Sequence, residues 1–268
     1  MNTLRAGWII TERDLTHWVR QPWAPILNLM FSVMLLLIFG PLFGGGMNVP
    51  GGGDYISYLV PGMLALTMMF GVGATTTAMG DDVKKGVTDR FRSMPIASGA
   101  VSLGRAGADM ANSVVELLLL LGVGFLIGWR SGAGLGPIVL AVLLLLALRF
   151  SLIWLGIFIA LTFRGEGAVT AVQVLVWPIG FLSSAIASPA TMPDWLGAVA
   201  AWNPISATAT AVRELFENPT GLTEAGVVID VASGPLADNA LLMAIAWPAL
   251  ITLVFIPLAA RAYRRLGR

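Results

Sequence analysis

Residues 81–109 read DDVKKGVTDRFRSMPIASGAVSLGRAGAD, a long polar segment between two hydrophobic runs that are each long enough to cross a bilayer. The segment carries both lysines of the chain and three of its arginines. Such a segment is either an ordinary solvated loop of a membrane protein or a docking helix that passes force to the membrane part from a soluble partner. The rest of the chain decides between these two interpretations.

The first part of this segment has the pattern of a short amphipathic helix. Its apolar residues recur at three- and four-residue spacing, at Val83, Val87, Phe91 and Met94. Pro95 is expected to end the helix, because proline disfavours helical geometry in the residue before it. Asp81 and Asp82 are expected at its start, where negative charge interacts favourably with the helix dipole. We therefore predict a loop helix within residues 81–97.

Composition indicates a membrane protein. Hydrophobic residues make up 57% of the chain and charged residues 12%, whereas a soluble domain carries about 25% charged residues. Lipid is therefore expected to cover most of the surface. The net charge of +1 argues against a nucleic-acid-binding face. Because the chain has no cysteine, it forms no disulfide, thiol nucleophile or thiolate metal site.

Several stretches are apolar over the length of about 20 residues that a bilayer span requires. They are residues 23–43, 55–79, 102–127, 135–163, 168–187 and 239–260. Prolines at positions 178, 248 and 257 predict kinks in the last two spans. The expected fold is an all-α polytopic membrane protein with six transmembrane helices, in which residues 1–268 form a single domain.

The N-terminal residues 1–22 are expected to be an interfacial helix rather than a signal peptide, because charged residues interrupt every apolar run. Apolar residues fall on one helical face, at Leu4, Trp8, Leu15, Trp18 and Val19. With the N-terminus in the cytoplasm, most of the 16 basic residues lie inside. The positive-inside rule therefore predicts that both termini are cytoplasmic.

Residues 188–238 are expected to form a long external segment with two short helices, 195–202 and 205–216, that are too short or too polar to span. These helices directly follow the fifth span. A re-entrant hairpin that caps the outer side is therefore predicted, with an ordinary surface loop as the alternative.

Two charged residues, Glu116 and Arg149, are predicted to lie near the middle of the membrane in the third and fourth spans. An unpaired charge there costs at least about 2.5–3.5 kcal/mol. We therefore expect them to pair between adjacent antiparallel helices, in a structural role rather than as a proton relay. Asp109 is a further acid in the third span.

Motifs for catalysis or nucleotide binding are absent from the sequence. It contains no G-x-x-x-x-G-K-[ST] phosphate loop and no G-x-S-x-G elbow. One histidine, His17, and no cysteine exclude histidine-rich zinc sites and Cys–His catalysis. The chain is therefore not expected to be an enzyme by itself.

Six stretches carry a resemblance to a known family. They are VRQPWAPI (19–26), YLVPGML (58–64), KKGVTDRFRSMPIASGAVSLGRAGAD (84–109), LTFRGEGAV (161–169), MPDWL (192–196) and AAWNPISATATAVREL (200–215). In order and spacing they resemble the ABC type-2 exporter permeases of the daunorubicin-resistance type. RFRSMPIA within the loop is the most specific of these matches.

The resemblance implies six spans, an N-terminal connecting helix, a coupling helix in the first cytoplasmic loop and a re-entrant outer hairpin. It also implies that two permease copies, identical or homologous, pair with two separate ATPase subunits in a bacterial cell membrane. ATP and Mg²⁺ would bind to that ATPase, and this chain would hold no cofactor. The expected activity is ATP-driven export of an amphipathic small molecule, drug or lipid.

The resemblance also implies roles for individual residues. The ATPase-coupling segment would include Asp82, Lys84, Gly86, Arg90, Arg92, Met94 and Pro95. The connecting helix would contribute Arg13, His17 and Arg20. The outer hairpin would include Met192, Pro193, Trp195, Asn203, Pro204 and Arg213, although SSAIASPAT (183–191) departs from the usual valine-rich form. The substrate path would be lined by residues of the first, second and fifth spans, namely Asn28, Phe31, Thr67, Met68, Phe70, Gln173, Trp177 and Phe181.

Two other functions remain as alternatives. A secondary, ion-coupled efflux transporter would need titratable intramembrane acids and internal inverted repeats, and the two halves of this sequence show no evident repeat. A non-transporting membrane scaffold would predict that replacing Gly86, Arg90 or Arg92 leaves efflux unchanged.

Overall fold

The computed structural model describes residues 3–20, 23–44, 55–88, 99–163, 166–189, 192–218, 222–224, 227–229 and 239–266. Within these ranges the chain forms nine helices and one pair of short strands. The helices are α1 (Thr3–Arg20), α2 (Trp23–Gly44), α3 (Tyr55–Lys84), α5 (Ala100–Leu126), α6 (Leu135–Thr162), α7 (Glu166–Phe181), α8 (Asp194–Ala201), α9 (Pro204–Leu215) and α10 (Ala240–Arg265). Strands β1 (Leu222–Glu224) and β2 (Val227–Ile229) pair antiparallel, with Leu222 opposite Ile229.

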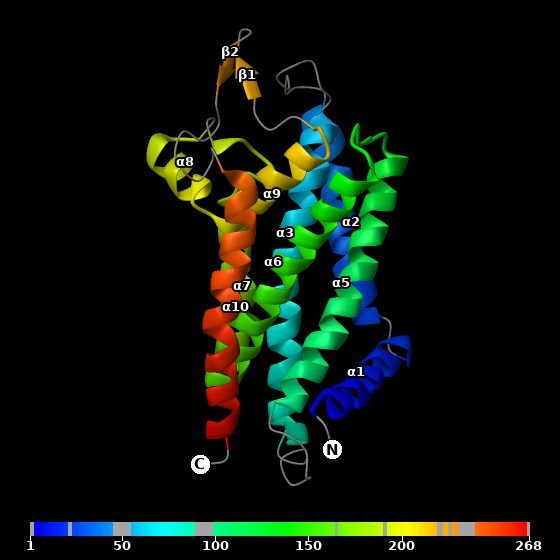
Figure 1. Ribbon diagram of the computed structural model, residues 1–268, viewed down its shortest axis with the longest axis vertical. Coiled ribbons are helices and arrows are strands. Elements are labelled where there is room, and N and C mark those ends of the chain that lie inside the picture. Colours follow the sequence, from blue (N-terminus) through cyan, green and yellow to red (C-terminus); the bar gives the residue numbers. More distant parts are fainter. Residues whose placement is uncertain are drawn as a thin grey trace.

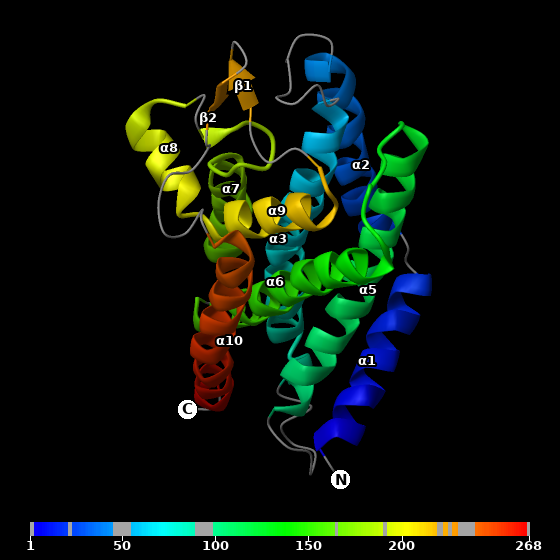
Figure 2. The ribbon, with the colours of Figure 1, turned by 45° about the horizontal axis from the view of Figure 1, so that its top comes forward.

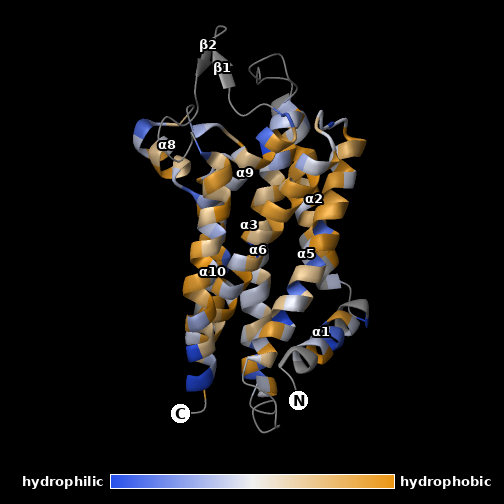
Figure 3. Cartoon of the chain, viewed as in Figure 1, coloured by the Kyte–Doolittle hydropathy of each residue, from blue (hydrophilic) through white to orange (hydrophobic). Residues whose placement is uncertain are grey.

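The long helices run side by side along the longest axis of the molecule (Figure 1). Both chain ends and helix α1 lie at one end of this bundle, which we call the terminal end. Helices α8 and α9 and the two strands lie at the opposite, far end, as the tilted view also shows (Figure 2). Hydrophobic residues dominate the long helices between the ends, and hydrophilic residues are most frequent near the ends (Figure 3).

Four helices, α3, α5, α6 and α10, are long and apolar enough to cross a membrane. They correspond to the second, third, fourth and sixth predicted spans. The first and fifth predicted spans contain shorter apolar helices, Leu29–Leu42 within α2 and Val169–Phe181 within α7. The helical, polytopic class is thus confirmed.

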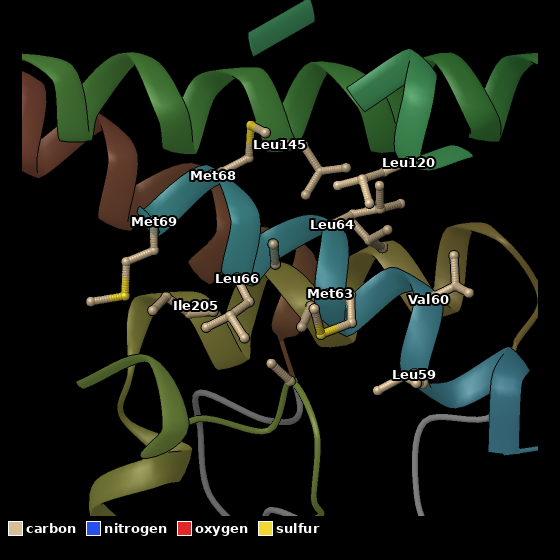
Figure 4. Close-up of a cluster of buried hydrophobic side chains, with 14 of the residues drawn as sticks. Leu59, Val60, Met63, Leu64, Leu66, Met68, Met69, Leu120, Leu145 and Ile205 are labelled. Atoms are coloured by element: carbon tan, nitrogen blue, oxygen red, sulfur yellow. The ribbon is translucent and has the colours of Figure 1, made fainter. Parts of the chain in front are cut away.

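Helix α3 lies at the centre of the bundle and is buried along nearly its whole length. It contacts α2, α5, α6, α7 and α9. Apolar side chains project from it in all directions, as expected of a helix that is hydrophobic all round. Among them, Leu64 and Met68 point towards Leu120 and Leu145, and Leu66 points towards Ile205 (Figure 4).

The structure corrects three expectations. Helix α3 continues to Lys84, so Asp81 and Asp82 lie in its last turn and do not begin a separate loop helix. Helix α7 ends at Phe181 rather than at position 187, and the carbonyls of Ile179 and Leu182 at this end accept hydrogen bonds from Asn203. The strands β1 and β2 were not expected in an all-α chain.

Candidate functional site

An aromatic cluster joins three of the helices that were predicted to line a substrate path. Phe31 of α2 and Phe70 of α3 both contact Trp177 of α7, with ring centroids 4.8 and 4.5 Å away. Phe181, one helical turn further along α7, stacks on Trp177 at 6.0 Å. Since aromatic pairs at these separations attract each other, the cluster holds α2, α3 and α7 together.

The aromatic cluster borders the surface of the chain. Trp177 is half-buried and Phe181 is 42% exposed. Nearby on α7, the exposed Gln173 donates a hydrogen bond to the hydroxyl of Thr77 on α3, at 3.1 Å. A second chain or an apolar molecule that approached this side of α7 would therefore meet aromatic and amide groups.

Two other predicted path residues are not members of the aromatic cluster. Thr67 and Met68 are fully buried within α3. Met68 points towards α6 (Figure 4). The side chain of Asn28 lies outside the described part of the chain. The structure therefore brings together Phe31, Phe70, Trp177 and Phe181, with Gln173 on the same helix, and the role of this set as a substrate path stays a prediction.

At the terminal end, a group of charged side chains connects α1 to α3 and α5. Asp14 accepts hydrogen bonds from the Arg13 Nε and Nη2 atoms at 2.9 and 2.6 Å. It also pairs with Arg105 of α5 at 3.3 Å. Arg13 lies 3.7 Å from Asp82 at the end of α3. The predicted residues Arg13 and Asp82 thus belong to one cluster, whose centre is Asp14.

The other predicted coupling residues differ in exposure and backbone conformation. Lys84 and Arg20 are exposed. Gly86 has a φ of +66°, in the left-handed region that favours glycine. The side chain of His17 and the residues Arg90, Arg92, Met94 and Pro95 lie outside the described part of the chain.

Helix α1 packs closely on α5 because small residues lie at their contact. The Thr11 hydroxyl donates to the carbonyl of Gly104 at 2.9 Å. A Cβ atom added at Gly104 would lie 2.7 Å from Ile10 Cγ2, and one at Gly107 would lie 2.7 Å from Thr11 Oγ1. Because the two helices are this closely packed, α1 and α5 are expected to move together.

In the middle of the bundle, Arg149 of α6 is 3% exposed and is held by hydroxyl groups. Its Nε donates to Ser113 Oγ at 2.8 Å, and its Nη2 donates to Thr75 Oγ1 at 3.1 Å. Thr75 in turn donates to Asp109 Oδ2 at 2.6 Å. Asp109 also lies 3.3 Å from Arg105. A continuous chain of polar contacts therefore runs from Asp14 on α1 to Arg149.

Glu116, the predicted partner of Arg149, is 4% exposed. It forms a side-chain hydrogen bond with Ser32 of α2 and interacts electrostatically with Arg149. Asp109 also interacts electrostatically with Arg149. The structure thus places two carboxylates near this guanidinium, and the direct pairing of Glu116 with Arg149 stays a prediction.

At the far end, Asn203 and Arg213 fix the region that was predicted as an outer hairpin. Asn203 caps α9 by accepting from the Ile205 N–H at 3.0 Å. Arg213 is fully buried. Met192, Pro193 and Pro204 are at least partly exposed, and Trp195 is 71% exposed. A shallow apolar groove of about 510 Å³ is lined by Ile179, Ala198, Val199, Trp202, Asn203 and Pro204.

Sequence reasoning missed several members of these clusters. The sequence predicted no role for Asp14, Thr75 or Ser113. The same holds for Tyr55 and Tyr58 of α3, whose hydroxyls donate to the carbonyls of Ile186 and Ser184 at the far end. The signal for Asp14 was its position next to Arg13, which was predicted to belong to the connecting helix. Threonine, serine and tyrosine are common in transmembrane helices, so Thr75, Ser113 and the two tyrosines gave no distinct signal.

Comparison with known proteins agrees with the family suggested by the sequence motifs. The ABC-2 type transporter family matches residues 5–216. The chain is 30% identical over 240 residues to the daunorubicin resistance ABC transporter permease protein of Streptomyces coeruleorubidus. The aligned region covers 89% of this chain and 77% of that protein. The matched region includes all but the first two residues of α1, the chain of polar contacts from Asp14 to Arg149, the aromatic cluster and α9. The chain therefore belongs to the ABC-2 type transporter family, as a transmembrane permease subunit that carries no ATPase site of its own.

Proposed function

We propose that this permease works with a separate ATPase subunit to export an amphipathic small molecule, drug or lipid from the cell. The observation that carries the proposal is the family match over residues 5–216 together with a similar permease of drug resistance. The aromatic cluster supports it, because polarisable aromatic side chains suit an adaptable apolar cargo.

The proposed arrangement is a bacterial inner-membrane protein with six spans, in which α2 and α7 are the first and fifth. Both termini face the cytoplasm, consistent with their position at the same end of the bundle (Figure 1). α8 and α9 form the outer re-entrant hairpin. Two permease copies assemble with two ATPase subunits, which bind ATP and Mg²⁺.

In the proposed mechanism, the ATPase acts on the segment 81–97 and on α1. Since α1 packs closely on α5, its movement is transmitted to α5. The polar chain through Arg105, Asp109 and Thr75 then connects α5 with α3 and α6. A tilt of α2, α3 and α7 would open a path along the aromatic cluster, between the two permease copies.

A transport assay separates this function from the alternatives. Cells that express the chain with a cognate ATPase subunit are loaded with ethidium, an amphipathic cation, and efflux is followed by fluorescence. ATP depletion is expected to stop efflux, and collapse of the proton gradient with ATP maintained is expected to leave it intact. The opposite pattern would indicate a secondary transporter. Efflux that is unaffected when Gly86 is replaced by valine would support the scaffold function.

Replacing Trp177 with alanine is expected to raise the ethidium concentration for half-maximal efflux about tenfold. Trp177 is central to the cluster, since it contacts both Phe31 and Phe70. An aromatic contact between its indole and the planar rings of ethidium would contribute about 0.5–1.5 kcal/mol, and the upper end of this range corresponds to about tenfold in affinity. Trp195→Ala is the matched control, because Trp195 is 71% exposed on α8. A Trp177→Ala variant with unchanged concentration dependence would remove the aromatic cluster from the substrate path.

A further inference from the structure

Between α7 and α8, residues 182–188 leave the helix and pass through the interior of the far end. Ser183, Ser184, Ala185 and Ser188 are each at most 3% exposed. Because this backbone is not helical, its carbonyls need partners from elsewhere in the protein.

Side chains of α3 and α9 supply these partners. The Tyr58 hydroxyl donates to the Ser184 carbonyl at 2.9 Å, and the Tyr55 hydroxyl donates to the Ile186 carbonyl at 3.0 Å. From α9, Asn203 Nδ2 donates to the Leu182 carbonyl at 2.8 Å. The segment is therefore held from both sides by side chains, and its conformation depends on them.

Arg213 makes the largest set of these contacts. Its Nη2 donates to the carbonyls of Ser184 and Ala185, at 2.8 and 3.2 Å. Its Nε donates to the carbonyl of Tyr58 at 3.0 Å, and the guanidinium lies 3.7 Å above the Tyr58 ring. One side chain thus joins α3, α9 and the segment 182–188.

The charge of Arg213 is balanced in an unusual way. Its side chain is 0% exposed, and among the described residues no carboxylate lies within ion-pair distance of it. A buried cation is tolerated only where its donors are satisfied. Here the backbone carbonyls of Tyr58, Ser184 and Ala185 accept its hydrogen bonds, and the Tyr58 ring lies against the guanidinium. Carbonyl groups at the C-terminal end of a helix, such as α7, also favour a nearby positive charge.

Gly62 of α3 provides the space for this arrangement. A Cβ atom at this position would lie 2.6 Å from Arg213 Nη2 and closer still to the Ala185 carbonyl oxygen. The glycine therefore lets the segment and the guanidinium approach the α3 backbone together.

We propose that Arg213 is a positioning residue that fixes the segment 182–188 and, through it, the end of α7 that carries Trp177 and Phe181. Helix α9, the segment and the first half of α3 then move as one unit. The consequence for export rests on the proposed function, whereas the conformation of the segment does not.

The conformation is tested by cysteine reactivity in the full-length protein reconstituted in lipid nanodiscs. The natural chain has no cysteine, so one introduced cysteine reports alone. Ser183→Cys is nearly isosteric and replaces a side chain that is 1% exposed. Arg213→Gln in this background is expected to raise the rate of reaction with N-ethylmaleimide at least about tenfold, because buried carbonyls lose their donors.

Ser102→Cys is the matched control, because Ser102 is also buried, at 3% exposed. It lies on α5 at the opposite, terminal end of the bundle, next to Gly104, which contacts α1. Its rate is expected to stay unchanged on Arg213→Gln. Arg213→Lys keeps the positive charge but lacks the planar set of donors of the guanidinium. It should give a rate at position 183 between those of the parent and of Arg213→Gln. Tyr58→Phe removes a single hydroxyl and should raise that rate about threefold, which provides a test if Arg213→Gln does not fold.

An unchanged rate at position 183 in both Arg213→Gln and Tyr58→Phe would overturn the proposal. Equal acceleration at positions 183 and 102 would also overturn it, because it would indicate general loss of folding. In ethidium efflux, Arg213→Lys is expected to lower the maximal rate severalfold at an unchanged amount of membrane protein. If the parent chain exports nothing, the proposed function fails, and the labelling result still decides the role of Arg213.

Discussion

Gly71→Ala is expected to prevent the chain from folding stably. A Cβ atom at this position would lie 2.7 Å from Arg149 Nη2 and closer still to Cζ. The guanidinium cannot move aside without losing its hydrogen bonds to Ser113 and Thr75. A displaced, buried arginine costs about 3–5 kcal/mol, which is a large part of the stability of a typical domain.

Gly73→Ala is the matched control, two residues along the same helix. Its Cβ would lie 3.6 Å from Gln173 Cγ, an ordinary van der Waals distance. Because alanine favours the helix over glycine by about 1 kcal/mol, this variant should be at least as stable as the parent. The measurement is the fraction of detergent-solubilised protein that elutes as a single species after heating. Equal heat stability of the two variants would show that Gly71 does not make the space for Arg149.

The positions of the long helices could be predicted from the sequence because their signal is local. The apolar runs that became α3, α5, α6 and α10 need only length and composition to be recognised. The short helices α8 and α9 likewise lie where patterning places them. The end of α7 could not be predicted, because it depends on Asn203, which lies more than 20 residues away in sequence.

The faces of the helices were harder to predict than their positions. Thr67, Met68 and Phe70 were all expected to line one path, but residues two positions apart in a helix, such as Met68 and Phe70, point to nearly opposite sides. In a membrane protein, apolar residues face both lipid and neighbouring helices, so hydrophobicity could not indicate whether Met68 or Phe70 faces α7. Only the packing does so, and it selects Phe70.

The partner of Arg149 shows a similar ambiguity. Asp109 and Glu116 are seven residues apart, so they lie on nearly the same face of α5. Periodicity therefore could not distinguish between them. The structure places both near Arg149, and it adds Arg105 as a second cation beside Asp109 at 3.3 Å.

Arg149→Met is expected to destabilise the protein by about 3–5 kcal/mol, because it leaves buried carboxylates without their cation. Combining it with Glu116→Gln should restore more stability than combining it with Asp109→Asn. Asp109 keeps its contact with Arg105 when Arg149 is lost, whereas Arg149 is the cation whose charge acts on Glu116. Heat stability of the three variants in detergent, with the parent alongside, measures the difference.

The triple variant Arg149→Met/Glu116→Gln/Asp109→Asn provides the control for size and shape. Asparagine at position 109 leaves Arg105 without its ion pair, so the triple variant should be less stable than Arg149→Met/Glu116→Gln. The exchange of charges in Glu116→Arg/Arg149→Glu should restore part of the stability lost in either single variant. If Asp109→Asn is instead the better rescue of Arg149→Met, then Asp109 is the principal counter-ion, and the predicted pairing of Glu116 with Arg149 is wrong.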